Sequence, residues 1–207
     1  MKRAITLTMT LLVVFSCKNK NTAYSKPIEG VELQSIILPN YPIWMLNRLS
    51  LIKTKENLNQ TNKQVFSLSR TSTTETAYAS ANNIPVEIGN YYRASVLVKQ
   101  DGLGASFGLR IIGEYPNRVD AVFDLEKGLI KGVSDVGTFI KGGAKIEDIG
   151  EGWYKCSLTA KTSAEIIKII LGPSSDSNSV ITWESANEKI ISICIIPSSL
   201  SLNELVL

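Results

Sequence analysis

Residues 146–159 read IEDIGEGWYKCSLT, and this stretch decides the fold. After the Gly-Glu-Gly sequence, the apolar residues Tyr154, Cys156 and Leu158 alternate with more polar ones. Successive side chains of a β-strand point to opposite faces, so these three residues share one face and Trp153 lies on the other. The stretch therefore predicts a turn followed by a strand whose apolar face contacts a core, while Trp153 either covers an outer sheet surface or lines a concave groove.

The same alternation recurs along most of the chain. In residues 91–99 (YYRASVLVK), for example, Tyr92 and Val96 are on one face and Arg93 is on the other. No stretch keeps a helical period over three turns, and many short strands at regular spacing are typical of sandwiches. We expect one all-β domain, an antiparallel β-sandwich (jelly roll). The expected strands are 31–38, 65–70, 73–80, 91–99, 106–112, 119–125, 129–133, 139–149, 153–160, 165–171, 179–184 and 189–196. Residues 41–45 are expected as a loop or short strand, and residues 53–63 as a loop.

The first seventeen residues, MKRAITLTMTLLVVFSC, have the features of an export signal. Two basic residues precede an apolar run that is too short to span a membrane, and the run ends at Ser16-Cys17. Residues 14–17 resemble a bacterial lipobox, which implies cleavage after residue 16 and lipidation of Cys17 with palmitate or a similar acyl chain. An ordinary signal peptide with an incidental cysteine and an apolar N-terminal strand remain alternatives. The expected organisation is a signal peptide (1–16), a lipidated tether (17–30) and one sandwich domain (31–207), anchored in the bacterial cell envelope on the periplasmic side or the outer surface.

Charge and composition exclude several function classes. The chain has no histidine, which removes Ser-His-Asp and Cys-His catalysis and nearly all catalytic zinc sites. Cleavage before Cys17 would leave 20 basic and 19 acidic residues, a balance of +1. No basic run remains in the expected domain, so we expect no nucleic-acid partner and membrane contact through the lipid alone.

The expected domain contains two cysteines, Cys156 and Cys194. An exported protein permits a disulfide, and two cysteines allow one intramolecular pairing. Both residues also lie in strand-like apolar segments, where a small buried thiol is common. A disulfide and two core thiols both remain open.

Two motifs carry a resemblance to a known family. FDLEKG at 123–128 and GEGWYKCS at 150–157, within this order of strands, resemble carbohydrate-binding-module-like jelly rolls close to families 4 and 9. Such domains also occur in phage tail and spike proteins. The likeness covers about the C-terminal half; the usual opening strand and the usual strand after Trp183 are replaced by other sequences. The resemblance implies sugar binding or a purely structural role.

Acidic residues offer little catalytic chemistry. Asp124 and Glu126 would share a strand face, but a glycosidase needs two carboxylates across a sugar, and an acid at a hairpin end stabilises the turn. Glu147, Asp148 and Glu151 surround a glycine turn; they form a solvated loop or, alternatively, hold a structural Ca²⁺. We expect no catalytic residue, no metal site and no other cofactor.

Aromatic and arginine side chains are the candidates for ligand binding, because flat rings stack on sugars and planar polar groups bind hydroxyls. Trp44 and Tyr41 lie in a proline-containing loop, and Tyr115 lies in the loop between two strands. Arg93 and Arg110 project from the less apolar faces of their strands. Trp153 and Trp183 complete the set of seven candidates. Each of the seven could instead have a purely structural role.

These observations lead to one expectation and two alternatives. We expect a non-catalytic envelope lipoprotein whose sandwich binds a polysaccharide or oligosaccharide, beside glycan-degrading or transport proteins. The first alternative is a structural or protein-interaction domain of a cell-envelope or phage-like assembly. The second is a polysaccharide lyase or hydrolase that uses tyrosine, lysine or carboxylates in place of histidine.

Overall fold

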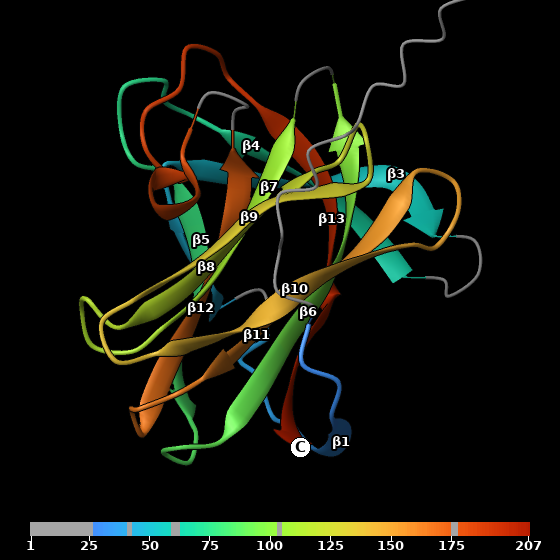
Figure 1. The fold of residues 1–207 in the computed structure, drawn as a ribbon. Helices are drawn as coiled ribbons and strands as arrows, with labels where there is room; N and C mark the ends of the chain where they lie inside the picture. Colours follow the sequence, from blue (N-terminus) through green and yellow to red (C-terminus); the bar gives the residue numbers. More distant parts are fainter. Residues whose placement is uncertain (1–26, 41–42, 59–62, 103–104, 175–177) are drawn as a thin grey trace, which may run out of the picture.

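A computed structural model describes residues 27–40, 43–58, 63–102, 105–174 and 178–207. These residues form two antiparallel sheets that pack face to face (Figure 1). Sheet A has the order β10-β11-β6-β13-β4-β3, with β1 also paired to β13, and sheet B has the order β2-β5-β12-β7-β8-β9. The expected antiparallel β-sandwich of the jelly-roll type is confirmed.

The strands follow one another along nearly the whole described chain. Their bounds are β1 Val31–Ile36, β2 Met45–Asn47, β3 Leu49–Leu58, β4 Lys63–Arg70, β5 Tyr78–Pro85, β6 Tyr91–Asp101, β7 Ser106–Ile112, β8 Arg118–Asp124, β9 Leu129–Val136, β10 Ile140–Asp148, β11 Trp153–Lys161, β12 Ile166–Ser174 and β13 Ser192–Val206. Figure 1 shows β1 beside the C-terminal end of β13. In the described residues, no helix is long and apolar enough to cross a membrane.

The core between the sheets is built from the alternating apolar residues. On β6, Tyr92, Ala94 and Val96 are at most 1% exposed and belong to the main cluster. On β11, Cys156 and Leu158 join the same cluster, whereas Trp153 belongs to a separate one. The predicted division of the 146–159 stretch into two faces is therefore confirmed.

One predicted loop and one predicted strand in the N-terminal half were wrong. Residues 53–58 continue β3, because this strand pairs with β4 up to Leu58, whose side chain packs with Val65 and Trp153. The strand expected at 73–80 instead runs from Tyr78 to Pro85. It passes through Asn82-Asn83 by a bulge, in which Asn83 has a positive φ of 57°.

Two further corrections concern the C-terminal part. The strand predicted at 179–184 is wrong: Val180–Thr182 form a short 3-10 helix, η2, because this segment packs on the outer face of sheet B instead of pairing within a sheet. The last strand begins three residues later than expected and runs on to Val206, since β1 and β6 supply partners for its C-terminal half.

The two cysteines of the domain are free. Cys156 lies in the core between the sheets, whereas Cys194 packs beside the separate cluster on the outer face of sheet A. Side chains on opposite faces of one sheet cannot reach the S–S bond length. Of the two alternatives that the sequence left open, a disulfide or two thiols, the structure has two thiols.

Candidate functional site

Sheet A has a gap beside β13. On one side of β13, β4 pairs as far as Ile195 and β1 pairs from Leu202 onward, so among the described strands none pairs with β13 between these residues. On the other side, the register with β6 shifts between Ile196 and Ser201. The Ser199 hydroxyl fills part of this irregularity, because it accepts a hydrogen bond from the Leu97 amide and donates one to the Ile196 carbonyl.

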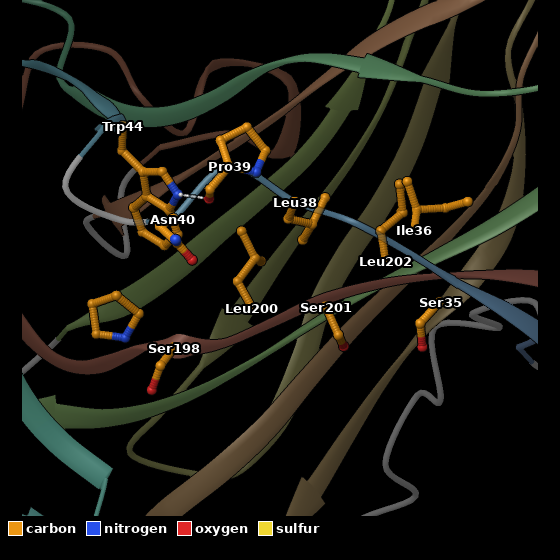
Figure 2. Close-up of a pocket in the computed structure, with 11 residues that line it drawn as sticks. Ser35, Ile36, Leu38, Pro39, Asn40, Trp44, Ser198, Leu200, Ser201 and Leu202 are labelled. Atoms are coloured by element: carbon orange, nitrogen blue, oxygen red, sulfur yellow. Dashed lines mark hydrogen bonds between the residues drawn. The ribbon is translucent and has the colours of Figure 1, made fainter.

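A pocket of about 520 Å³ lies at this gap (Figure 2). One wall comes from β1 and the segment after it, and the other comes from the irregular part of β13. In Figure 2 Trp44 and Asn40 lie at one end of the pocket, and Ser35 and Ile36 lie at the other. The pocket is lined by Ser35, Ile36, Leu38, Pro39, Asn40, Trp44, Pro197, Ser198, Leu200, Ser201 and Leu202. None of these residues is charged.

Trp44 is the sequence candidate that lines this pocket. Its side chain is only 7% exposed and also contacts the main core. The indole Nε1–H donates to the Pro39 carbonyl at 3.1 Å, which fixes the ring against the segment after β1. Trp44 therefore offers a small area of rigid apolar surface to a ligand. Tyr41, its predicted companion, lies outside the described residues.

The polar groups of the pocket are hydroxyls and one amide. Asn40 and Ser198 are exposed, and Ser201 is half-buried. The Ser35 hydroxyl donates to Asn203 Oδ1 at 2.8 Å, so its oxygen is left to accept from a ligand. The pocket thus combines an apolar lining with neutral donors and acceptors, a mixture common in small-molecule sites.

Trp183 and Arg110 lie together on the outer face of sheet B, away from this pocket. Trp183 is fully buried over Gly108, where an added Cβ would come within 2.1 Å of the ring. Gly132 likewise leaves room for Val180. The glycines of β7 and β9 therefore form a shallow depression that residues 178–187, here called the Trp183 segment, fill.

A buried ion-pair cluster holds the Trp183 segment on the sheet. Arg110 donates to Asp120 Oδ1 at 2.5 Å and to both carboxylate oxygens of Glu184 at 2.7 and 3.0 Å. The Trp183 indole also donates to Asp120 Oδ1, at 3.1 Å. Burial alone would lower the pKa of Arg110, but the carboxylates of Asp120 and Glu184 raise it above its ordinary value. Arg110 is thus a permanent cation committed to internal partners.

The other candidates are also engaged by the protein. Arg93 donates to the Ile28 carbonyl at 2.8 Å, and the Ile28 amide donates to the Gly142 carbonyl at 2.7 Å, so the segment at Ile28 crosses the outer face of sheet A. Trp153 is 3% exposed within its own cluster. Tyr115, in contrast, is 77% exposed, and the Arg118 guanidinium lies 5.7 Å from its ring centroid.

The acidic residues that the sequence singled out make local contacts with neighbouring groups. Asp124 Oδ1 accepts from the amides of Glu126 and Lys127, which is the turn-stabilising role. Glu147 pairs with Lys145, and Asp148 accepts from the Gly150 amide. Within the described residues no group of three or more His, Cys, Asp or Glu side chains is placed to hold a metal ion.

Of the residues that line the pocket, the sequence analysis had identified Trp44 alone as a candidate for ligand binding. The missed residues come from 35–40 and 197–202, which lie some 160 positions apart in the chain yet face one another. The one available signal was the sequence Pro-Ser-Ser-Leu-Ser at 197–201 after an apolar run. A proline removes a ladder donor, so it indicates an interruption in the strand.

Comparison with known proteins gives structural likeness alone. No protein-family model matches the chain, and no curated protein matches it. Among solved structures, the CBM22-1–GH10 modules of Clostridium thermocellum endo-1,4-beta-D-xylanase 10B, complexed with xylohexaose, share 13% identity over 83% of this chain, with a TM-score of 0.45. This chain spans 28% of that one. The CBM6cm-2 module of Cellvibrio mixtus lichenase 5A, in complex with cellotriose, shares 8% identity over 86% of this chain and 99% of its own, with a TM-score of 0.37.

Both similar structures contain carbohydrate-binding modules with a sandwich of this kind, and neither module is named as family 4 or 9. At these identities and TM-scores the similarity concerns the arrangement of strands. The ligand of this chain has to be inferred from its own residues.

Proposed function

We propose that the sandwich binds carbohydrate in the pocket beside β13, without catalysing a reaction, and that a lipid on Cys17 holds it on the bacterial envelope. The observation that carries the binding proposal is the uncharged pocket itself. Its volume lies within the range of small-molecule sites, and it places the Trp44 ring beside the Asn40 amide and several hydroxyls. A sugar presents apolar C–H faces and hydroxyl edges, which match this mixture.

The lack of an acid in the pocket supports a binding role over a cleaving one. Glycoside hydrolysis requires two carboxyl groups facing the scissile bond. All eleven residues that line the described pocket are apolar or neutral polar. The buried acids Asp120 and Asp124 are committed to Arg110 and to a turn.

Affinity electrophoresis of the full chain through gels containing polysaccharides tests the proposal. Ser198→Trp should abolish the retardation, because a large side chain at this exposed position would fill the pocket. Lys168→Trp, also at an exposed position but on β12 of sheet B, should leave retardation unchanged. Equal retardation of both variants would show that the pocket is not the site, and a panel without any retardation would refute carbohydrate binding.

The anchor at Cys17 is proposed from residues 1–17, which lie outside the described part of the chain. Cys17→Ser should stop incorporation of labelled palmitate and move the protein from the membrane fraction to the soluble one. Unchanged labelling of the variant would rule out this cysteine. On a membrane, the module would hold glycan near degrading or transport proteins, and cross-linking in cells followed by identification of the partners would test that association.

A protein-interaction role is the second candidate, and one surface favours it. The segment from β1 to β2 exposes a succession of large apolar side chains along the edge of the sandwich. They are Val31, Leu33, Ile37, Ile43, Met45 and Leu46. Exposed apolar patches commonly mark contacts with other proteins. Loss of a copurifying protein from Leu33→Ser plus Ile37→Ser, with glycan binding unchanged, would support this role.

A further inference from the structure

The pocket beside β13 has a more specific chemistry than sugar binding in general requires. Seven of its eleven lining residues are apolar. In Figure 2 Leu38 and Leu200 occupy the middle of the pocket, between Trp44 at one end and Ser35 at the other, and Leu202 lies beside Ile36 towards Ser35. An unmodified pyranose carries hydroxyls around its whole edge, and an aliphatic lining would leave several of them without partners.

The main chain of β13 adds polar groups to this apolar lining. Between Ile195 and Leu202, β13 has no described strand partner on the side of β4 and β1. Residues 197–202 nevertheless line the pocket almost continuously. Main-chain amide and carbonyl groups along an unpaired edge are strong hydrogen-bonding groups that require partners. A ligand in the pocket would therefore lie next to this strand edge, in which Pro197 has no N–H and the Ile196 carbonyl already accepts from Ser199, and directly beside aliphatic side chains.

An acetamido group is complementary to both features. Its planar amide can pair with a strand edge as another peptide would, and its methyl group fits against leucine side chains. From this combination we infer that the pocket takes an uncharged N-acetylated sugar unit, with the acetamido group against β13 and the leucines. The inference rests on the proposed carbohydrate binding and specifies its ligand class.

The same lining selects against charged sugars. A free amino sugar carries a cation, and a uronic acid carries an anion, yet no side chain of opposite charge lines the pocket. Moving such a charge out of water without a partner is costly. Removing the acetyl group therefore has two effects in one direction: it deletes the methyl contact and adds an unpaired charge.

Isothermal titration of the full chain with three disaccharides tests the inference. The probes are the β-1,4-linked disaccharide of N-acetylglucosamine, its de-N-acetylated diamine and cellobiose. We expect the N-acetylated disaccharide to bind at least about tenfold more tightly than either of the others, the scale of one apolar group in a fitted pocket. Equal or tighter binding of cellobiose or the diamine would overturn the inference while leaving the proposed function intact. Failure of all three, together with no retardation by any polysaccharide gel, would overturn both.

Two variants locate the selectivity within the pocket. Leu200→Ser should reduce binding of the N-acetylated disaccharide about tenfold and leave cellobiose binding unchanged, because only the acetyl methyl loses a contact. Leu200 is half-buried, so Asn40→Ala, at an exposed position, provides a second variant that keeps the fold. It should weaken both sugars equally. A Leu200→Ser protein that folds and retains full selectivity would contradict the placement of the acetyl group.

Discussion

At the scale of single residues, one glycine determines whether Trp183 can be buried. A Cβ at Gly108 would lie 2.1 Å from the Trp183 ring, whereas a Cβ at Gly172 would lie 3.5 Å from it, an ordinary contact distance. Overpacking of this kind costs about 1–3 kcal/mol or more. Gly108→Ala should lower the free energy of unfolding in urea by about 3 kcal/mol, and Gly172→Ala should change it much less. Similar losses for both would mean that the ring is not held against Gly108.

Cys194 has a pKa that determines its reactivity. Burial, with help from Asp101 and Glu56, raises the pKa of this thiol to about 11. Because the thiolate is the reactive species, alkylation at pH 8 should be roughly a hundredfold slower than that of free cysteine, and its rate should keep rising up to about pH 11. The measurement uses Cys17→Ser with Cys156→Ala, so that one thiol remains.

The matched control for this measurement is Ser198→Cys in a background that also lacks Cys194. This position is exposed, so its thiol should alkylate at nearly the free rate. A Cys194 rate that levels off near pH 9 would contradict the effect of burial.

At the scale of elements, two buried arginines hold the Trp183 segment: Arg70 donates to the main-chain carbonyls of Glu184 and Ser185, and Arg110 forms the ion pair with Glu184. Arg110 joins Asp120 of β8 to Glu184 of the segment, with a side chain only 7% exposed. Removing one member of a buried ion pair typically costs about 3–5 kcal/mol. Arg110→Leu should therefore reduce stability by this amount and increase amide hydrogen exchange throughout residues 178–187.

Arg93→Leu is the control for the Arg110→Leu experiment, because it makes the same substitution on sheet A, away from the Trp183 segment. It should free the Ile28 region and leave exchange in residues 178–187 as it is. Increased hydrogen exchange of the Trp183 segment in Arg93→Leu would contradict a specific role of Arg110. Unchanged exchange of the segment in Arg110→Leu would contradict it as well.

The elements also show how far the sequence could lead. Alternation in β6 and β11 gave their inward faces correctly, since the apolar side chains that alternate along each strand enter the core between the sheets. The segment 179–184 carries a similar β-rich composition, but its partner is the depression at Gly108 and Gly132 on another part of the chain. Local composition contains no information about such a surface, so the strand prediction failed there. The pocket was missed for the same reason: its two walls meet only because β1 pairs with β13.

At the scale of the whole molecule, the domain holds together by packing and pairing, with Cys156 and Cys194 free. A native disulfide would contribute about 2–5 kcal/mol, equivalent to at least about 4 °C in Tm for a chain of this size. The Tm should therefore be the same, within about 1 °C, with and without dithiothreitol. A fall of several degrees on reduction would reveal a disulfide in the domain.

The first residues that the structure describes lie across the outer face of sheet A, through the Ile28–Gly142 hydrogen bond and the Arg93 contact. A sensor chip coupled through a cysteine at the exposed Glu29 would therefore hold the molecules with the outer face of sheet A towards the support and sheet B towards the liquid. A hydrogen bond that ties a terminal segment to one sheet thus provides a point for oriented immobilisation.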